Sequence, residues 1–139
     1  MKYLIRLVVF TVLMIFFYLL YAPFPYSYTK VAIPEYVPIS KELKTTVNLR
    51  RTALCSYTLE QRVFDAENTK VFDEITNRSQ PDKLGVDSFN STVVLDTLPV
   101  EGPAFYQVRM SSKCNFVQKW FPNQGEWITV FFEYIKEEK

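Results

Sequence analysis

The sequence predicts a mostly β protein, in which an N-terminal transmembrane helix precedes a sandwich of two β-sheets. Three observations carry this prediction. Residues 7–22 form a run of 16 residues without a charge, a glycine or a proline. Later runs are rich in β-branched and aromatic residues, which favour strands. Clusters of Pro, Gly, Asn and Asp separate these runs, as turns do. A chain of 139 residues has room for one ordinary domain beside the helix.

The apolar run is predicted to be a membrane anchor. As a helix it measures about 24 Å, and adding residues 3–5 brings it to about 30 Å, the thickness of a hydrocarbon core. Arg6 can extend its guanidinium to the headgroups, and tyrosines near both ends suit the interfaces. A cleaved signal peptide is the alternative, but no small-x-small cleavage site follows the run. The predicted anchor residues are Arg6, Leu7, Phe10, Leu13, Phe16, Tyr18 and Tyr21.

The charges around the anchor predict its orientation. Lys2 and Arg6 precede the span, and the next charge along the chain is Lys30. The positive-inside rule then keeps the N-terminus in the cytoplasm and exports residues 23–139. In a bacterium this is a single-pass protein of the inner membrane with its domain in the periplasm. We therefore divide the chain into an anchor (1–22), a juxtamembrane segment (23–39) and an extracytoplasmic β-rich domain (40–139).

The two cysteines, Cys55 and Cys114, predict one disulfide bond. An even number of cysteines in an exported domain favours pairing. A free catalytic thiol would need a base, and the sequence contains no histidine.

The juxtamembrane segment contains four prolines and three tyrosines, so it is neither a continuous helix nor a slack tether. Two interpretations remain open. The segment is the first edge strand of the domain, with Pro34 and Pro38 protecting that edge. Alternatively, it is a strip that docks another envelope protein. The docking residues would then be Phe24, Tyr26, Tyr28 and Tyr36.

Four runs are predicted to form strands: 45–64, 91–98, 104–110 and 126–135. The first alternates with a period of two, and a turn near residues 50–52 would split it into an antiparallel pair. In the last, Trp127, Thr129 and Phe131 lie opposite another apolar set. A strand that is apolar on both faces is expected to be central or covered by a neighbour. The run "NQGEWITVFFEYI" resembles the last strand of many immunoglobulin-like domains, which implies an immunoglobulin-like sandwich.

Residues 58–77 have two interpretations. The spacing of Thr58 and Gln61 fits a capping box, and Asp65 could cap a second start, so one short helix over 66–76 is an option. The same residues also fit a hairpin around residues 65–68. We favour a strand for 57–64.

The missing residue types argue against catalysis. Without histidine, an imidazole base and the common zinc sites are excluded. Three scattered glycines form no phosphate loop or dinucleotide fingerprint. Without Lys2 and Arg6, 14 basic residues face 15 acidic ones, so no field for nucleic acid exists. We expect no catalytic residue, metal, cofactor, nucleic acid or small-molecule substrate.

The sequence therefore predicts a protein that acts by binding a protein partner in the cell envelope, while its helix contacts the bilayer. The leading hypothesis is an immunity or inhibitor protein that neutralises a toxin or enzyme acting in the periplasm. The alternative is an accessory structural subunit of a multiprotein envelope assembly.

Overall fold

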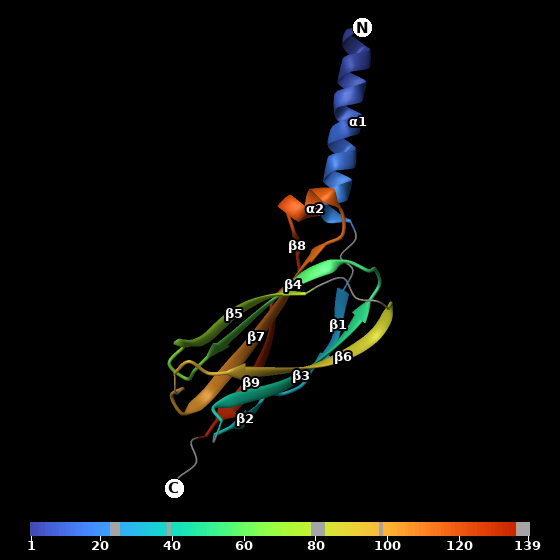
Figure 1. Ribbon diagram of the computed structural model, residues 1–139. Coiled ribbons are helices and arrows are strands. Elements are labelled where there is room, and N and C mark those ends of the chain that lie inside the picture. The colour runs from blue at the N-terminus through green and yellow to red at the C-terminus, as the bar shows by residue number, and fades with distance from the viewer. Residues whose placement is uncertain (23–25, 39, 79–82, 98, 136–139) are drawn as a thin grey trace.

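A computed structural model describes residues 1–22, 26–38, 40–78, 83–97 and 99–135 of this chain. A long helix at the N-terminus stands on one end of a β-sandwich (Figure 1). The helices are α1 (Lys2–Tyr21) and α2 (Phe116–Trp120). The strands are β1 (Tyr26–Val31), β2 (Glu35–Val37), β3 (Glu42–Arg51), β4 (Ser56–Phe64), β5 (Lys70–Arg78), β6 (Gly85–Val94), β7 (Gly102–Lys113), β8 (Asn123–Gln124) and β9 (Ile128–Tyr134).

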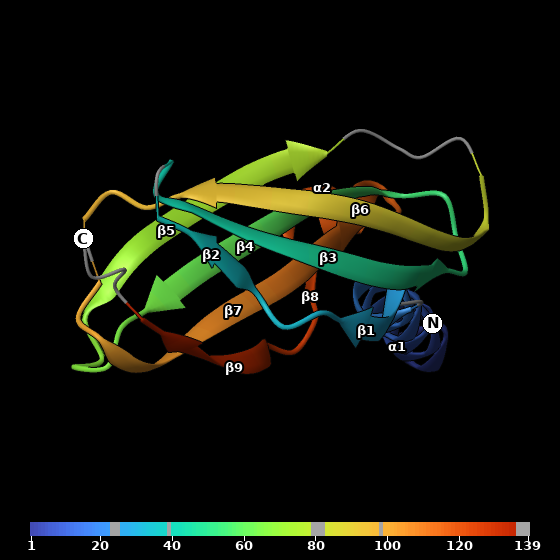
Figure 2. The same ribbon diagram turned by 90° about the horizontal axis from the view of Figure 1, so that it is seen from below.

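The strands form two antiparallel sheets, which confirms the predicted fold class. In the first, sheet A, β3 is central; β6 lies along one side of it, and β1 and β2 share the other. In the second, sheet B, the order is β5-β4-β7, and the far side of β7 pairs with β9 and then with β8. Figure 2 shows the two layers from below, with β3 and β6 in one and β4 and β7 in the other.

The period-two pattern of the sequence produces the core. Alternate residues of β3, β4 and β7 are buried, because successive side chains of a strand point to opposite faces. The inward set is apolar and packs between the sheets. It includes Leu43, Leu49, Tyr57, Leu59, Val63, Val71, Val93, Leu95, Ala104, Tyr106, Val108, Met110, Phe132 and Tyr134.

The predicted pairing within residues 45–64 is wrong. The run does break in two, with β3 ending at Arg51 and β4 beginning at Ser56. However, β3 pairs with β1, β2 and β6, whereas β4 pairs with β5 and β7, so the two halves belong to different sheets. A period-two pattern says which face is buried, and both halves bury the expected face. It carries no information about the neighbouring strand.

The hairpin interpretation of residues 58–77 is correct, and the helix over 66–76 is wrong. Asp65 is buried, and one of its carboxylate oxygens accepts hydrogen bonds from the backbone N–H groups of Glu67 (3.1 Å) and Thr69 (2.8 Å). Its other oxygen accepts from the N–H of Val100 (3.2 Å). The carboxylate thus caps a turn between β4 and β5 rather than a helix. The short helix of this fold, α2, lies elsewhere.

The juxtamembrane segment contributes the two short strands β1 and β2, which pair with β3. Tyr36 packs against the core, with its ring edge-on to that of Tyr134 at 4.6 Å between centroids. It is therefore held by its own domain. Phe24 lies outside the described residues, as do the side chains of Tyr26 and Tyr28, so docking through these three stays a prediction.

The predicted disulfide between Cys55 and Cys114 is present. Cys55 directly precedes β4 and Cys114 directly follows β7, and the adjoining residues Ser56 and Lys113 are paired. The bond thus joins the ends of two neighbouring strands of sheet B. It also holds the connection between β3 of sheet A and β4 of sheet B close to the start of α2.

Replacing Cys55 with Ala should lower the free energy of unfolding by about 2–5 kcal/mol, because the bridge restricts the unfolded chain. Denaturant unfolding of the full-length protein measures this loss. A double Cys55→Ala, Cys114→Ala variant should be about as unstable as the single one. An unchanged midpoint in both variants would contradict a stabilising role for the bridge.

Candidate functional site

The outer face of sheet B carries a group of aromatic and arginine side chains. We call this group the aromatic face. It comprises Arg62, Phe64, Phe105, Arg109, Trp127 and Phe131. These residues come from β4, β7, β9 and the residue before β9. Their neighbours in sequence on the same strands point inward to the core, so the strand period itself brings them onto one surface.

Three phenylalanines form one end of the aromatic face. The rings of Phe64 and Phe105 are stacked, with centroids 4.8 Å apart, and the ring of Phe131 lies 5.9 Å from that of Phe105. Phe131 is 70% exposed. Within the described residues β9 pairs only with β7, so it is an edge strand. The prediction that this strand is central or covered is therefore wrong, and a large apolar side chain remains open to a partner.

At the other end of the aromatic face, two arginines contact the ring of Trp127. The guanidinium carbons of Arg62 and Arg109 each lie 4.5 Å from the centroid of the Trp127 ring system. A cation over an indole face is attracted by the ring quadrupole. The arginine positions are fixed in turn by carboxylates. Arg109 pairs with Glu60 at 2.6 Å and Arg62 with Asp73 at 3.4 Å.

Asp73 also accepts a hydrogen bond from the ammonium of Lys70 at 2.6 Å. This bond, with the positive charges of Lys70 and Arg62 nearby, holds the pKa of the Asp73 carboxyl below its usual value, although burial acts in the opposite direction. Asp73 is therefore ionised at neutral pH and keeps Arg62 oriented. The aromatic face is thus ordered before any partner binds, which lowers the entropy cost of binding.

The composition of the aromatic face is typical of protein-binding surfaces. Trp, Arg and large aromatic residues are enriched at the positions that contribute most to protein–protein affinity. The hollow described below lies on the other sheet and includes none of these residues. The aromatic face can contact a protein partner over an extended area.

The outer side of sheet A is different in character. A hollow of about 450 Å³ lies there, next to the break between β1 and β2. Hydroxyl and amide side chains line much of it, including Thr46, Asn90 and Thr92, with Glu35 and Lys44 at its rim. No group of three or more metal-ligating side chains occurs in the part of the chain that the structure describes.

Helix α1 is exposed from Lys2 to Tyr18, and Leu19 and Leu20 near its end are half-buried. It is long and apolar enough to cross a membrane, a property that a signal sequence near an N-terminus shares. The predicted anchor residues all lie on it, and none of them is buried by the sandwich.

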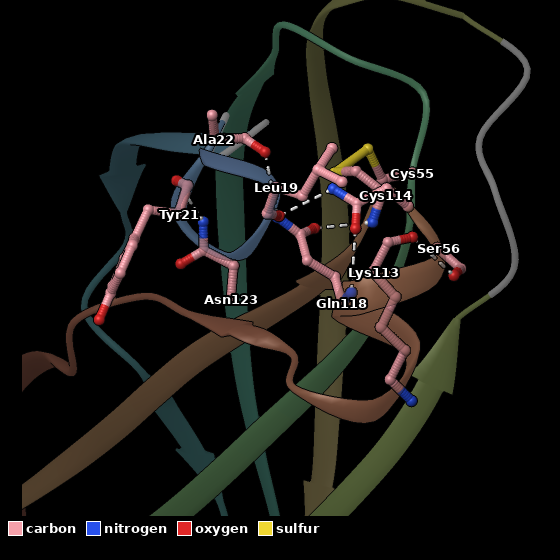
Figure 3. Close-up of a disulfide and its surroundings, with 10 residues drawn as sticks. Leu19, Tyr21, Ala22, Cys55, Ser56, Lys113, Cys114, Gln118 and Asn123 are labelled. Atoms are coloured by element: carbon pink, nitrogen blue, oxygen red, sulfur yellow. Dashed lines mark hydrogen bonds between the residues drawn. A yellow bond between two sulfur atoms is a disulfide. The ribbon is translucent and has the colours of Figure 1, made fainter. Parts of the chain in front are cut away.

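The end of α1 is bonded to the sandwich by side-chain amides (Figure 3). Gln118 is fully buried, and its Nε2 donates to the carbonyl oxygens of Leu19 (3.2 Å) and Ala22 (3.1 Å). Its Oε1 accepts from the N–H of Cys114 (2.9 Å). The last carbonyls of a helix have no partner within the helix, so these bonds supply what α1 lacks.

Two asparagines complete this junction. Asn115 Nδ2 donates to the Leu19 carbonyl (2.9 Å), while its Oδ1 caps α2 by accepting from the N–H of Gln118 (3.0 Å). Asn123 Nδ2 donates to the carbonyl of Tyr21 (3.2 Å). No sequence pattern predicted a role for these three amides. Single Asn and Gln residues give no signal of a partner about 100 residues away in sequence.

Comparison with known proteins gives no function. No protein family matches the chain, and no curated protein does. Fourteen chains of solved structures match. Two are structures of a β-glucuronidase from Parabacteroides merdae, at 17% and 18% identity with TM-scores of 0.47 and 0.45. The match covers 78% of this chain and 13% of theirs. A likeness this weak bears on neither activity nor substrate.

Replacing Gln118 with Ala should loosen the junction, because it removes three hydrogen bonds and leaves two helix carbonyls with fewer donors. The docking of α1 should weaken by about 2–4 kcal/mol. Spin labels at Val8 in α1 and Val86 in β6 would report this as a broadened distance distribution. Lys119→Ala, at the exposed neighbouring position, should leave the distribution unchanged. Equal, narrow distributions in both variants would contradict the role given to Gln118.

Proposed function

We propose that this chain is a membrane-anchored, non-catalytic binding protein that presents the aromatic face of sheet B to a protein partner. The observation that carries the proposal is the exposure of the Phe131 ring. The ring lies on an edge strand and is open to solvent. Beside it are two stacked phenylalanines and a tryptophan whose ring contacts two arginines. Exposed apolar groups of this kind mark interaction sites on otherwise polar surfaces.

The membrane location rests on α1 and on the charges around it. An exposed apolar helix of 20 residues is costly in water and favourable in a bilayer. Lys2 and Arg6 before the span favour a cytoplasmic N-terminus, and the disulfide suits an oxidising compartment outside. We propose a single-pass protein with its sandwich in the periplasm of a bacterium.

Two roles are compatible with such a surface. The first is an immunity or inhibitor protein, for which an anchor only keeps the protein near a toxin or enzyme that acts in the periplasm. The second is an accessory subunit of an envelope assembly, in which the domain must hold one direction relative to the membrane. The hydrogen-bonded junction favours the second role, because a simple tether has no need of a buried amide cap.

The topology predicts the activity of C-terminal fusions. A reporter that works only outside the cytoplasm, fused after Lys139, should be active. The reason is that Lys2 and Arg6 retain the N-terminus inside while the uncharged run of residues 7–22 crosses once. A cytoplasmic reporter at the same place should be inactive, and the opposite pattern would contradict the proposed orientation.

The aromatic face predicts position-specific cross-linking to the partner. A photoreactive amino acid at Phe131 in the full-length protein, irradiated in intact cells, should give an adduct of one defined mass. The same group at Val86, which is as exposed as Phe131 but lies on sheet A, should not. Adding Trp127→Ala should reduce the Phe131 adduct by about tenfold or more, the effect of losing a central hot-spot residue.

The same experiment separates the two roles. With Gln118→Ala, an inhibitor should keep its adduct, because binding needs only the aromatic face. A subunit of a membrane assembly should lose it, because the direction of the domain is no longer fixed. Equal adducts at Phe131 and Val86, or an adduct insensitive to Trp127→Ala, would contradict the proposed binding face.

A further inference from the structure

Helix α2 exposes its large apolar side chains, unlike an ordinary surface helix. Its buried residues are Val117 and Gln118, and its cap Asn115 also points into the junction. The large apolar rings face outward instead. Phe116 is 68% exposed, Trp120 82% and Phe121, the residue after the helix, 58%. A surface helix normally turns such rings toward the core.

These rings lie beside the apolar helix α1. Figure 1 shows α2 lying across the foot of α1, at the end of the sandwich nearest to it. The ring of Phe121 meets the ring of Phe16 edge-on at 6.5 Å between centroids. Phe16 lies five residues before the end of α1, or about 7.5 Å back along the helix axis. Phe121 therefore lies alongside the apolar helix, and not beyond its end.

We propose that α2 is a second membrane contact, whose exposed rings insert into the boundary between headgroups and acyl chains of the bilayer that α1 crosses. This proposal rests on the membrane anchorage proposed above. Interfacial helices bury their apolar side about 5–10 Å into that boundary, which agrees with the depth at which Phe16 places Phe121. Trp120 is the residue type that membrane interfaces favour most clearly, together with Tyr.

The remaining charges agree with a bilayer surface. Lys119 is the only charged residue of α2, and it is exposed, where its ammonium can meet lipid phosphates. No acidic residue occurs between Lys113 and Glu126 to repel those phosphates. The lipid contact is continuous with α1, because the amide bonds of Asn115 and Gln118 hold α2 against the helix end. Two points of contact then set the tilt of the sandwich, which one helix alone would leave free.

The two tryptophans of the chain provide a matched test. Trp120 is on α2, whereas Trp127 is on the aromatic face. Full-length Trp127→Phe and Trp120→Phe variants each keep one tryptophan as a reporter. Both are reconstituted into phosphatidylcholine vesicles, with and without bromine on the acyl carbons nearest the headgroup. Bromine quenches tryptophan only at close range. Trp127→Tyr serves as a second background should Trp127→Phe not fold.

Brominated lipid should reduce the fluorescence of the variant that retains Trp120 by about twofold, as expected for an indole at the acyl boundary. The variant that retains Trp127 should lose less than about a tenth. Trp127 contacts Arg109, which lies four residues, or about 13 Å, along β7 from Lys113 at the junction. Flotation of the vesicles after a urea wash reports insertion of α1 separately.

Three outcomes would overturn the inference. Trp120 that stays unquenched in floating vesicles refutes the α2 contact alone and leaves the anchorage intact, whether water or a second copy of the chain covers the ring. Equal quenching of both tryptophans refutes the proposed orientation of the sandwich. Protein that does not float refutes both the α2 contact and the membrane anchorage.

Discussion

The end of α1 needs hydrogen-bond donors, and the sandwich supplies them. A helix leaves its last carbonyls without partners, and water or a cap must satisfy them. Here the amides of Asn115, Gln118 and Asn123 bind the carbonyls of Leu19, Tyr21 and Ala22. Gln118 is fully buried in this role, so losing its partners would leave a buried polar group unsatisfied. These bonds therefore fix the orientation of the helix relative to the sandwich.

The disulfide and the junction form one structural unit. Cys114 stands directly before Asn115, and its backbone N–H donates to Gln118 (Figure 3). Cys55 ties the same point to the start of β4. From there β4 and β7 run away from the junction, and Phe64 lies eight residues along β4, about 26 Å from Ser56. The phenylalanine end of the aromatic face thus stands well clear of the end of α1 and is open to a protein partner.

Buried polar groups fix how the two sheets face each other. Gln61 of sheet B is buried, and its Oε1 accepts hydrogen bonds from Tyr106 (2.8 Å) in the same sheet and from Ser91 (2.5 Å) in sheet A. Burial raises the pKa of the Tyr106 phenol well above its usual value, and burial with the neighbouring Tyr36 raises that of Tyr134 to about 12. Both phenols stay protonated across the physiological range, so Tyr106 remains a donor. Buried hydrogen bonds that join the two sheets in this way favour one alignment of the sheets over others.

The sequence by itself determined the apolar helix, the inward face of each strand and the cysteine pair. Composition, a period of two and an even number of cysteines are local or simple signals. It also indicated the aromatic face, in the second apolar set of residues 127–131, although that set was assigned to a covered strand. Only the tertiary structure decided that β3 and β4 enter different sheets, that Tyr36 packs against Tyr134, and that Gln118 caps a helix about 100 residues earlier. These contacts join segments far apart in sequence. Which segments meet depends on how the whole core closes, and no local pattern encodes that.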